Sequence, residues 1–509
     1  MPSVLASVAT FALEGVSSRE VTVEADVRRG LPTFTLVGLP DRAVRESRER
    51  VRAALLNSEL EFPMKRLTVN LAPAHLRKAG PGFDLAIAVG LLAASGQVPP
   101  EALEGCAVCG ELSLSGELRP VRGALAAALG ARAAGLRRLI LAPENGPEAA
   151  LVEEIEVLTA PTLTRMADLL HARWSPDPAR PAPRSEREQA PVLDFADVRG
   201  QEDAKRALEI AAAGGHNVLM IGPPGAGKTM MARRLPGILP PPTQEEALEI
   251  TQIQGAAGLG SGHLACERPF RSPHHTTSPQ GLVGGGSSPL PGEITLAHRG
   301  VLFLDELAEF GRSALDALRQ PLEDGTVQIM RSQRSVTFPA RAMLVAACNP
   351  CPCARPGARC SCGPQERSRY ARRLSGPLLD RIDLLCQVDP VPLHALTDSE
   401  AAGSRNTASV QAAALAARER QLQRLAGTGA TCNGDMSARL TRRIVRVEPD
   451  ARERLLAAAE RHVLSGRGHD RVLRVARTIA DLAGREQVES ADVDEALGYR
   501  VAGWDELAA

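Results

Sequence analysis

The residues best suited to phosphate chemistry follow the apolar run 218–221, which is typical of a short buried strand. They are Gly222, Pro223, Pro224, Gly225, Ala226, Gly227, Lys228, Thr229 and Met230. Backbone N–H groups of such a loop point at phosphate oxygens, the lysine reaches the outer phosphates, and the hydroxyl binds Mg²⁺. Lysine is rare in this chain and is otherwise found only at Lys65, Lys78 and Lys205, so a lysine in this loop is not explained by a lysine-rich composition. The stretch predicts a P-loop for ATP and Mg²⁺; a loop that merely turns the chain is the alternative.

Two further apolar runs end in polar residues that suit the same chemistry. Residues 301–304 lead into Asp305 and Glu306, and residues 343–348 lead into Asn349. Because ligands of parallel sheets bind at the carboxyl ends of the strands, we expect Asp305 and Glu306 to meet the loop. Asp305 would hold Mg²⁺ through water, and Glu306 would polarise the attacking water. A coincidental strand end is the alternative.

Length and composition limit the wider possibilities. The chain has 509 residues, which predicts two to four domains. Its formal net charge is +0, so a nucleic-acid surface has to be local. The apolar stretch 85–95 is too short for a membrane span, and residues 1–20 do not form a signal peptide. We therefore expect a cytoplasmic protein without a membrane partner, whose ten cysteines are reduced.

Hydrophobic periodicity predicts an α/β multidomain protein. Strand patterns in 4–36, 67–71, 108–112 and 139–141 alternate with helix patterns at 41–56, 83–94 and 123–135. The C-terminal part has helix patterns at 409–425, 449–464, 467–484 and 490–497. Arg418, Arg420 and Arg424 in the first of these are expected on a solvated face. The predicted domains are an α/β domain at 1–172, a Pro-rich linker at 173–192, the P-loop domain with its insertion at 193–395 and a helical lid at 396–509.

Four cysteines follow directly after Asn349 in the pattern CxC, six residues, CxC. They are Cys351, Cys353, Cys360 and Cys362. Thiols at this density in a reducing compartment predict a tetrahedral structural Zn²⁺ site. An iron–sulfur cluster and unliganded thiols are the alternatives. Arginines surround the cluster, so a basic loop that is held by the metal is a reasonable DNA contact. The separate pair Cys106 and Cys109 is interpreted as two buried core thiols.

The segments 78–84 and 110–121 resemble the proteolytic domain of Lon proteases. That chemistry needs a serine nucleophile and a lysine that lowers its pKa. This chain has Gly82 at the serine position and Leu125 or a neighbour at the lysine position. The resemblance therefore implies a Lon-like domain without protease activity, serving as a scaffold or assembly module.

The central region resembles AAA+ ATPases. Residues 194–201 are similar to their nucleotide-side entry, and Asn349 matches sensor 1. Residues 375–383 resemble the arginine-finger segment of magnesium-chelatase and MCM-type members, which assigns the finger to Arg381. Residues 465–477 resemble the sensor 2 helix, with Arg467 as sensor and Arg474 as the alternate. A finger acts on a neighbouring subunit, so the resemblance implies a homo-oligomer, a hexameric ring.

The insertion 239–299 carries the segments 268–277, 284–286 and 291–293. With residues 296–300, these resemble the ComM/YifB group of magnesium-chelatase-like AAA+ proteins over nearly the whole chain. The resemblance implies an ATP-driven motor on branched or single-stranded DNA, with branch-migration or helicase activity in natural transformation or recombination. A protein-remodelling chaperone and a chelatase-like subunit for metal insertion are the alternatives.

Basic residues of this insertion are candidate contacts to DNA phosphates. They are Arg268, Arg271, His274, His275 and Arg299. For His274 and His275, a phosphate or subunit contact, a structural role and a metal site all stay open.

Overall fold

The computed structural model describes residues 5–182, 193–286, 289–331, 334–355, 360–374, 376–391, 405–461 and 464–508, with backbone only at 331, 334, 376–377 and 501–508. The described chain forms two compact units. Unit 1 comprises Met1–Glu188 and Ala247–Ala265, and unit 2 comprises Gln189–Glu246 and Cys266–Ala509. No helix in the described part of the chain combines the length and apolar character that a membrane span requires.

Unit 1 is built on a mixed sheet in the order β3-β4-β2-β1-β5-β8-β9. The strands β1, β2 and β4 pair antiparallel, whereas β5, β8 and β9 continue the sheet in parallel. The strands are β1 (Leu5–Glu14), β2 (Ser17–Arg28), β3 (Thr33–Val37), β4 (Arg66–Ala72), β5 (Cys106–Val108), β8 (Arg138–Leu141) and β9 (Glu156–Thr159), with a separate pair β6 (Glu111–Leu112) and β7 (Leu118–Arg119). The strand expected at 108–112 is therefore two short strands in different sheets.

The helices of unit 1 bury apolar faces against this sheet. They are α1 (Arg42–Asn57), α2 (Asp84–Ala94), α3 (Ala124–Ala133), α4 (Gly146–Ala149) and α5 (Leu163–Leu170). Asp41 caps α1 by accepting from the Val44 N–H at 2.8 Å, which fixes the start of that helix. Cys106 and Cys109 are both buried, and the Cys109 sulfur lies 3.3 Å from the Thr10 hydroxyl, which confirms the interpretation of core thiols.

A segment from the P-loop region packs as part of unit 1. It contains most of α8 (Gln244–Ala257). The Gln252 side chain donates to the Val16 carbonyl at 2.9 Å, and the Gly123 N–H donates to the Gly255 carbonyl at 3.3 Å. Part of the expected linker also belongs to this unit, because the Ala179 N–H donates to the Val157 carbonyl at 2.8 Å. Residues 183–192 of that linker lie outside the described residues.

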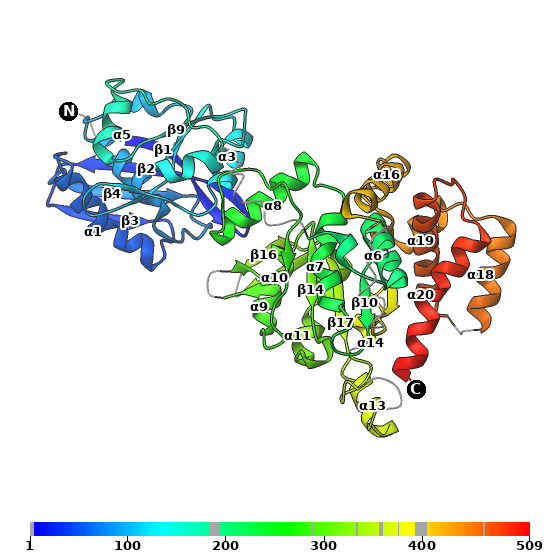
Figure 1. The fold of residues 1–509 in the computed structure, drawn as a ribbon. Coiled ribbons are helices and arrows are strands. Elements are labelled where there is room, and N and C mark those ends of the chain that lie inside the picture. The colour runs from blue at the N-terminus through cyan, green and yellow to red at the C-terminus, as the bar shows by residue number, and fades with distance from the viewer. Residues whose placement is uncertain are drawn as a thin grey trace. The chain divides into compact units, whose positions relative to one another are not determined.

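Unit 2 contains an all-parallel sheet in the order β11-β14-β17-β10-β18 (Figure 1). Its strands are β10 (Val218–Ile221), β11 (Phe270–Arg271), β14 (Val301–Leu304), β17 (Met343–Cys348) and β18 (Leu384–Gln387). Residues of β10, β14 and β17 are buried throughout, as expected for strands covered on both faces. The three apolar runs predicted as strands are therefore central strands of one sheet.

Shorter elements complete the P-loop part of unit 2. Its helices are α6 (Glu202–Gly214), α7 (Lys228–Ile238), α9 (Pro279–Val283), α10 (Glu293–Leu296), α11 (Arg312–Ala317), α12 (Arg319–Asp324), α13 (Pro364–Ala371), α14 (Gly376–Leu379) and the 3₁₀ turn η6 (Leu307–Glu309). Two small antiparallel pairs are β12 (Gly284–Gly285) with β13 (Leu290–Pro291), and β15 (Thr326–Arg331) with β16 (Arg334–Pro339).

The C-terminal helices gather beside α6, from orange to red in Figure 1. They are α16 (Thr407–Leu425), α17 (Ala438–Ile444), α18 (Pro449–Arg461), α19 (Gly466–Leu482) and α20 (Ser490–Ala508). Two differences from the sequence prediction are clear: α17 has no counterpart in it, and α20 continues well past Leu497. Residues 392–404, where the lid boundary was predicted, lie outside the described residues.

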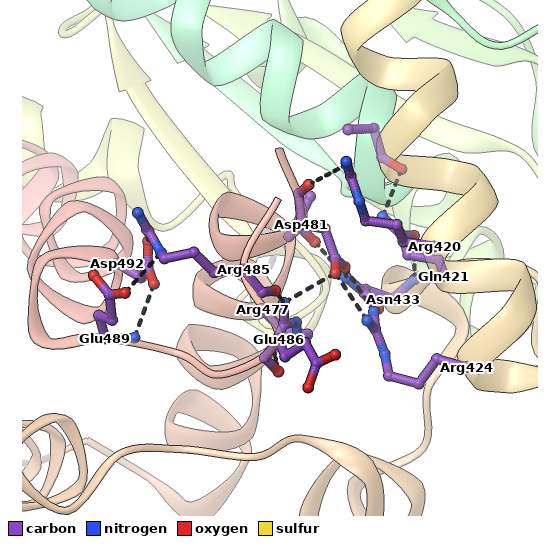
Figure 2. A network of polar contacts seen from close by, with 12 residues as sticks. Arg420, Gln421, Arg424, Asn433, Arg477, Asp481, Arg485, Glu486, Glu489 and Asp492 are labelled. Atoms are coloured by element: carbon purple, nitrogen blue, oxygen red, sulfur yellow. Dashed lines mark hydrogen bonds and ion pairs between the residues drawn. The ribbon is translucent and has the colours of Figure 1, made fainter. Parts of the chain in front are cut away.

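Two arginines of α16 are structural rather than solvated. Arg424 donates to both carboxylate oxygens of the buried Asp481, at 2.8 and 2.6 Å, and Arg420 donates to the Asp481 carbonyl (Figure 2). Arg418 donates to the carbonyl of Ala213 at 3.0 Å. The expectation of a solvated face was wrong for the half-buried Arg418 and Arg424, because their guanidinium groups satisfy acceptors of neighbouring elements. Arg420 is exposed, as expected, although it donates to the same helix as Arg424.

Candidate nucleotide site and cysteine cluster

The parallel register brings the predicted site residues to one edge of the sheet. Ile221 pairs with Cys348, and Leu304 pairs with Ala346. The residues that follow each strand, which include Gly222, Asp305 and Asn349, therefore emerge together at the carboxyl ends, where open α/β sheets bind their ligands.

The backbone of the loop requires its glycines. The Gly222 N–H donates to the Cys348 carbonyl at 3.2 Å, and a Cβ at Gly222 would lie 2.1 Å from the Val388 carbonyl oxygen. Gly225 and Gly227 have φ values of 79° and 92°, which side-chain-bearing residues rarely adopt. The loop then leads directly into α7 at Lys228, so the helix N-terminus faces the same space.

Lys228 is buried and held by the loop itself. Its Nζ donates to the carbonyls of Gly222 and Pro223 at 2.6 and 2.9 Å and lies 3.4 Å from Oδ1 of Asn349. Burial lowers the pKa of Lys228 from its ordinary value. The direct partners of its ammonium group are thus neutral oxygens rather than a carboxylate, which suits a phosphate.

Thr229 and Asp305 are in direct contact. The Thr229 hydroxyl donates to Oδ2 of Asp305 at 2.7 Å, which places two oxygen ligands of the kind Mg²⁺ prefers side by side. Glu306 follows with φ of 51°, an uncommon conformation for a non-glycine residue. Its own N–H donates to Oδ1 of Asp305 at 2.9 Å, and its half-exposed carboxylate lies 3.5 Å from Nδ1 of His275.

The His275–Glu306 contact was missed at the sequence level. His275 lies in the insertion and had an open role, because no periodic pattern connects it to Glu306. The structure places its ring beside the predicted catalytic carboxylate and tilted by 33° against the ring of His274, with ring centroids 4.1 Å apart.

The predicted arginine finger, Arg381, and the predicted sensor 2 residue, Arg467, lie elsewhere in unit 2. Arg381 is largely buried and pairs with Glu323, while its carbonyl accepts from the Asn217 side chain at 2.9 Å. Arg467 is exposed in the first turn of α19. The alternate sensor, Arg474, lies 3.3 Å from Asp383.

Asp383 is the centre of a buried charge cluster two residues after Arg381. It contacts Arg474, Arg471 at 3.7 Å and His216 at 3.2 Å. Burial raises the pKa of Asp383, but the positive charges, Arg474 first, outweigh it and lower the pKa to about 2. The cluster fixes the segment that carries Arg381 to α19.

The arginines of the insertion have internal partners. Arg268 donates to Glu246 at 2.7 Å, Arg271 forms a bidentate pair with Glu293 at 2.7 and 2.9 Å, and Arg299 lies 3.6 Å from Glu246. These carboxylates hold the insertion in place, and the contact of its arginines with DNA phosphates stays a prediction.

The four cysteine sulfurs converge. Cys351, Cys353, Cys360 and Cys362 all lie within 4.8 Å of one another, and the Cys351, Cys353 and Cys360 sulfurs are 3.4 to 3.6 Å apart. Tetrahedral zinc with bonds of ~2.3 Å separates its sulfur ligands by about 3.8 Å. Backbone N–H groups, Arg355 first, lower the pKa of Cys353 to about 5, whereas burial raises the pKa of Cys351 to about 12. The cluster is compatible with a structural metal site.

Known protein families match three successive parts of the chain. Residues 194–396 match the family model "Magnesium chelatase, subunit ChlI", residues 23–145 match "Subunit ChlI of Mg-chelatase", and residues 404–500 match "Magnesium chelatase, subunit ChlI C-terminal". The uncharacterized protein YifB of Salmonella typhimurium is 44% identical over 499 residues, and the competence protein ComM of Haemophilus influenzae is 44% identical over 504 residues. Each match covers 97% of both chains.

The chain belongs to the YifB/ComM group of magnesium-chelatase-like AAA+ proteins. Membership of this AAA+ group indicates ATP and Mg²⁺ as ligands. The site fits them, because this YifB/ComM chain presents a lysine held by neutral oxygens, a glycine loop and a paired hydroxyl and carboxylate at one strand edge.

The YifB/ComM chain also has a partial match to Lon protease 2 of Bacillus subtilis, 32% identical over 143 residues and covering 26% of each chain. In unit 1, Gly82 has no side chain and Leu125 is fully buried. The absence of a Lon-type dyad at Gly82 and at Leu125 or a neighbour stays a prediction from the sequence.

Proposed function

We propose that the protein is a ring-forming, ATP-hydrolysing motor that acts on branched or single-stranded DNA, with branch-migration or helicase activity in natural transformation or recombination. The observation that supports it most is the convergence of Lys228, Thr229, Asp305 and Asn349 at one edge of a parallel sheet, in a chain 44% identical to a competence protein. DNA remodelling is the competence-related work that such a motor performs.

Each residue at the site has a role in hydrolysis. Lys228 would bind the outer phosphates, and Thr229 and Asp305 would hold Mg²⁺, whose positive charge would balance the charge that develops during phosphoryl transfer. Glu306 accepts a proton from the water that attacks the terminal phosphorus, while the bond to the leaving diphosphate oxygen breaks. Asn349 orients that water, and His275 holds the Glu306 carboxylate from its other side.

The site is completed by a neighbouring subunit. Arg381 would leave Glu323 and reach the terminal phosphate bound by the next copy, and Arg467, which is exposed, would contact nucleotide from the lid. An arginine finger is worth about 10³–10⁵ in rate in well-studied enzymes. A closed homo-oligomer, a hexameric ring, gives every site such a neighbour.

The cysteine cluster would hold one structural Zn²⁺. Its donor set is four thiols, and no open ligand position for substrate is expected in such a site. Zinc would therefore fix the loop between Asn349 and α13 rather than take part in hydrolysis.

A second candidate is a chelatase-like subunit that drives metal insertion, which the three chelatase family matches favour. The two functions differ in what stimulates ATP hydrolysis. A DNA motor should hydrolyse ATP several-fold faster with a synthetic four-way junction or a single-stranded oligonucleotide, and slower as salt rises. Hydrolysis that is indifferent to DNA over the whole salt series would contradict the DNA function.

A further inference from the structure

A basic pocket of about 420 Å³ lies in unit 2 beside the nucleotide site. One wall is the segment 308–312, which begins two residues after Glu306, and the other is α13 with the two residues that follow it. The lining side chains that matter here are Glu309, Phe310, Arg312, Arg369, Arg372 and Arg373.

The pocket has an excess of positive charge. Arg373 lies 3.7 Å from Glu309, so this pair is close to neutral. Arg312 lies no closer than 3.9 Å to Asp316 and is 82% exposed. Within the part of the chain that the structure describes, Arg369 and Arg372 are exposed and have no carboxylate partner.

Several arginines elsewhere in unit 2 are instead paired with internal acceptors, as with Arg271, Arg424 and Arg474. In a chain of formal net charge +0, a cluster without internal partners favours an external anion. Planar guanidinium forks suit phosphate oxygens, which they bind with two parallel hydrogen bonds.

Both walls of the pocket are connected to the hydrolysis site. The first wall continues directly from Glu306 through η6. In the second wall, burial raises the pKa of Tyr370 in α13, and the nearby backbone N–H of Asn349 opposes that shift. Arg367, one turn earlier in α13, donates to the Cys360 sulfur at 3.4 Å, so the cysteine cluster anchors the same helix.

We propose that this pocket binds backbone phosphates of single-stranded DNA and that its occupancy accelerates ATP hydrolysis by repositioning Glu306 and Asn349. The proposal rests on the DNA function proposed above and names the arginines that bind the phosphates of the DNA backbone. It assigns to α13 a task beyond packing, which is to connect bound DNA to the residues that place the attacking water.

The test uses the full chain with Arg369→Gln and Arg372→Gln combined. The matched control is Arg443→Gln with Arg452→Gln, which removes the same charge from exposed lid positions. A second pocket variant, Arg369→Lys with Arg372→Lys, keeps the charge. Binding of a fluorescent 30-nucleotide single strand is measured by anisotropy over a salt series, together with ATP hydrolysis with and without that strand.

The glutamine pocket variant should bind about tenfold more weakly. Its plot of log affinity against log salt should be shallower by about 1.4, at ~0.7 for each phosphate that the variant no longer neutralises. Its hydrolysis without DNA should equal that of the wild type, whereas stimulation by DNA should disappear. The lysine variant should recover most of the binding, and the lid control should behave as the wild type.

Three outcomes would overturn the proposal in distinguishable ways. If the glutamine variant keeps the affinity and the salt slope of the wild type, the pocket is not the DNA-binding site, but the proposed DNA function still stands. Loss of hydrolysis or of assembly without DNA would instead assign these arginines to a contact with the acidic surface of a neighbouring subunit. Failure of the wild type itself to bind DNA would refute both the pocket and the proposed function.

Discussion

Lys228 and Glu306 occupy different environments in the same site. Lys228 is enclosed by carbonyl oxygens of its own loop, whereas Glu306 is half exposed and its carboxylate lies beside His275. A change at Lys228 therefore removes a binding charge, and a change at Glu306 removes a proton acceptor while the rest of the site is retained.

Lys228→Ala should abolish nucleotide binding and hydrolysis together. Glu306→Gln should keep nucleotide binding but lower the hydrolysis rate by about 10²–10⁴-fold, the usual contribution of a general base. Fluorescent-nucleotide binding and phosphate release separate the two effects, with the exposed Glu453→Gln as the control. Sustained turnover by either site variant would contradict the assignment.

Asp383 should make stability depend on acidity. Because its pKa of about 2 lies below the ordinary value of ~3.9, its contribution to folding is complete above pH ~4 and is lost as the pH falls toward 2. Asp383→Asn should destabilise unit 2 by about 3–5 kcal/mol at pH 7, since it leaves buried arginines without their counter-charge. Thermal unfolding followed by circular dichroism should show that gap as constant from pH 7 to 4 and narrower below pH 4. A gap that does not change below pH 4 would exclude Asp383 as its source.

At the scale of elements, apolar runs predicted the part of the site that depends on buried strands. All three continuous apolar runs are central strands of the sheet: 218–221, 301–304 and 343–348. A run without polar residues is typical of a strand that is covered on both faces. Parallel pairing then places whatever follows each strand at one edge, so Lys228, Asp305 and Asn349 could be brought together from the sequence.

Other contacts have no periodic signal in the sequence. The His275–Glu306 and Arg381–Glu323 pairs join polar residues of different elements, and their partners are set only by tertiary packing. The same holds for the segment 247–265, whose helix pattern predicts α8 but not that it packs in unit 1. Arginines were the least predictable residues, because a surface contact and a buried ion pair have the same local sequence.

The cysteine loop should depend on metal. Purified protein should contain one zinc per chain by elemental analysis, and Cys351→Ser or Cys360→Ser should reduce that content to near zero. Because the loop joins Asn349 to α13, loss of metal should also lower the hydrolysis rate without weakening nucleotide binding. Cys266→Ser, outside the cluster, should retain its zinc, and a metal-free wild type would refute the site.

At the scale of the whole molecule, the assignment of Arg381 as an arginine finger predicts a shared active site. Arg381→Ala and Lys228→Ala should each be nearly inactive alone. Mixed together, they should recover measurable hydrolysis, because an intact P-loop in one subunit can meet an intact Arg381 from its neighbour. If every mixture has only the summed activity of its parts, Arg381 acts within its own chain or not at all.

The central claim is that hydrolysis at the Lys228–Asp305 site does work on DNA. The most direct measurement is the conversion of a fluorescently labelled four-way junction into duplex products, comparing wild type with Glu306→Gln at equal DNA occupancy. The account predicts that the wild type converts the junction into duplex products only with ATP and Mg²⁺, whereas the Glu306→Gln variant binds the junction and leaves it intact. Vigorous ATP hydrolysis by the wild type on a junction that stays intact would contradict the account.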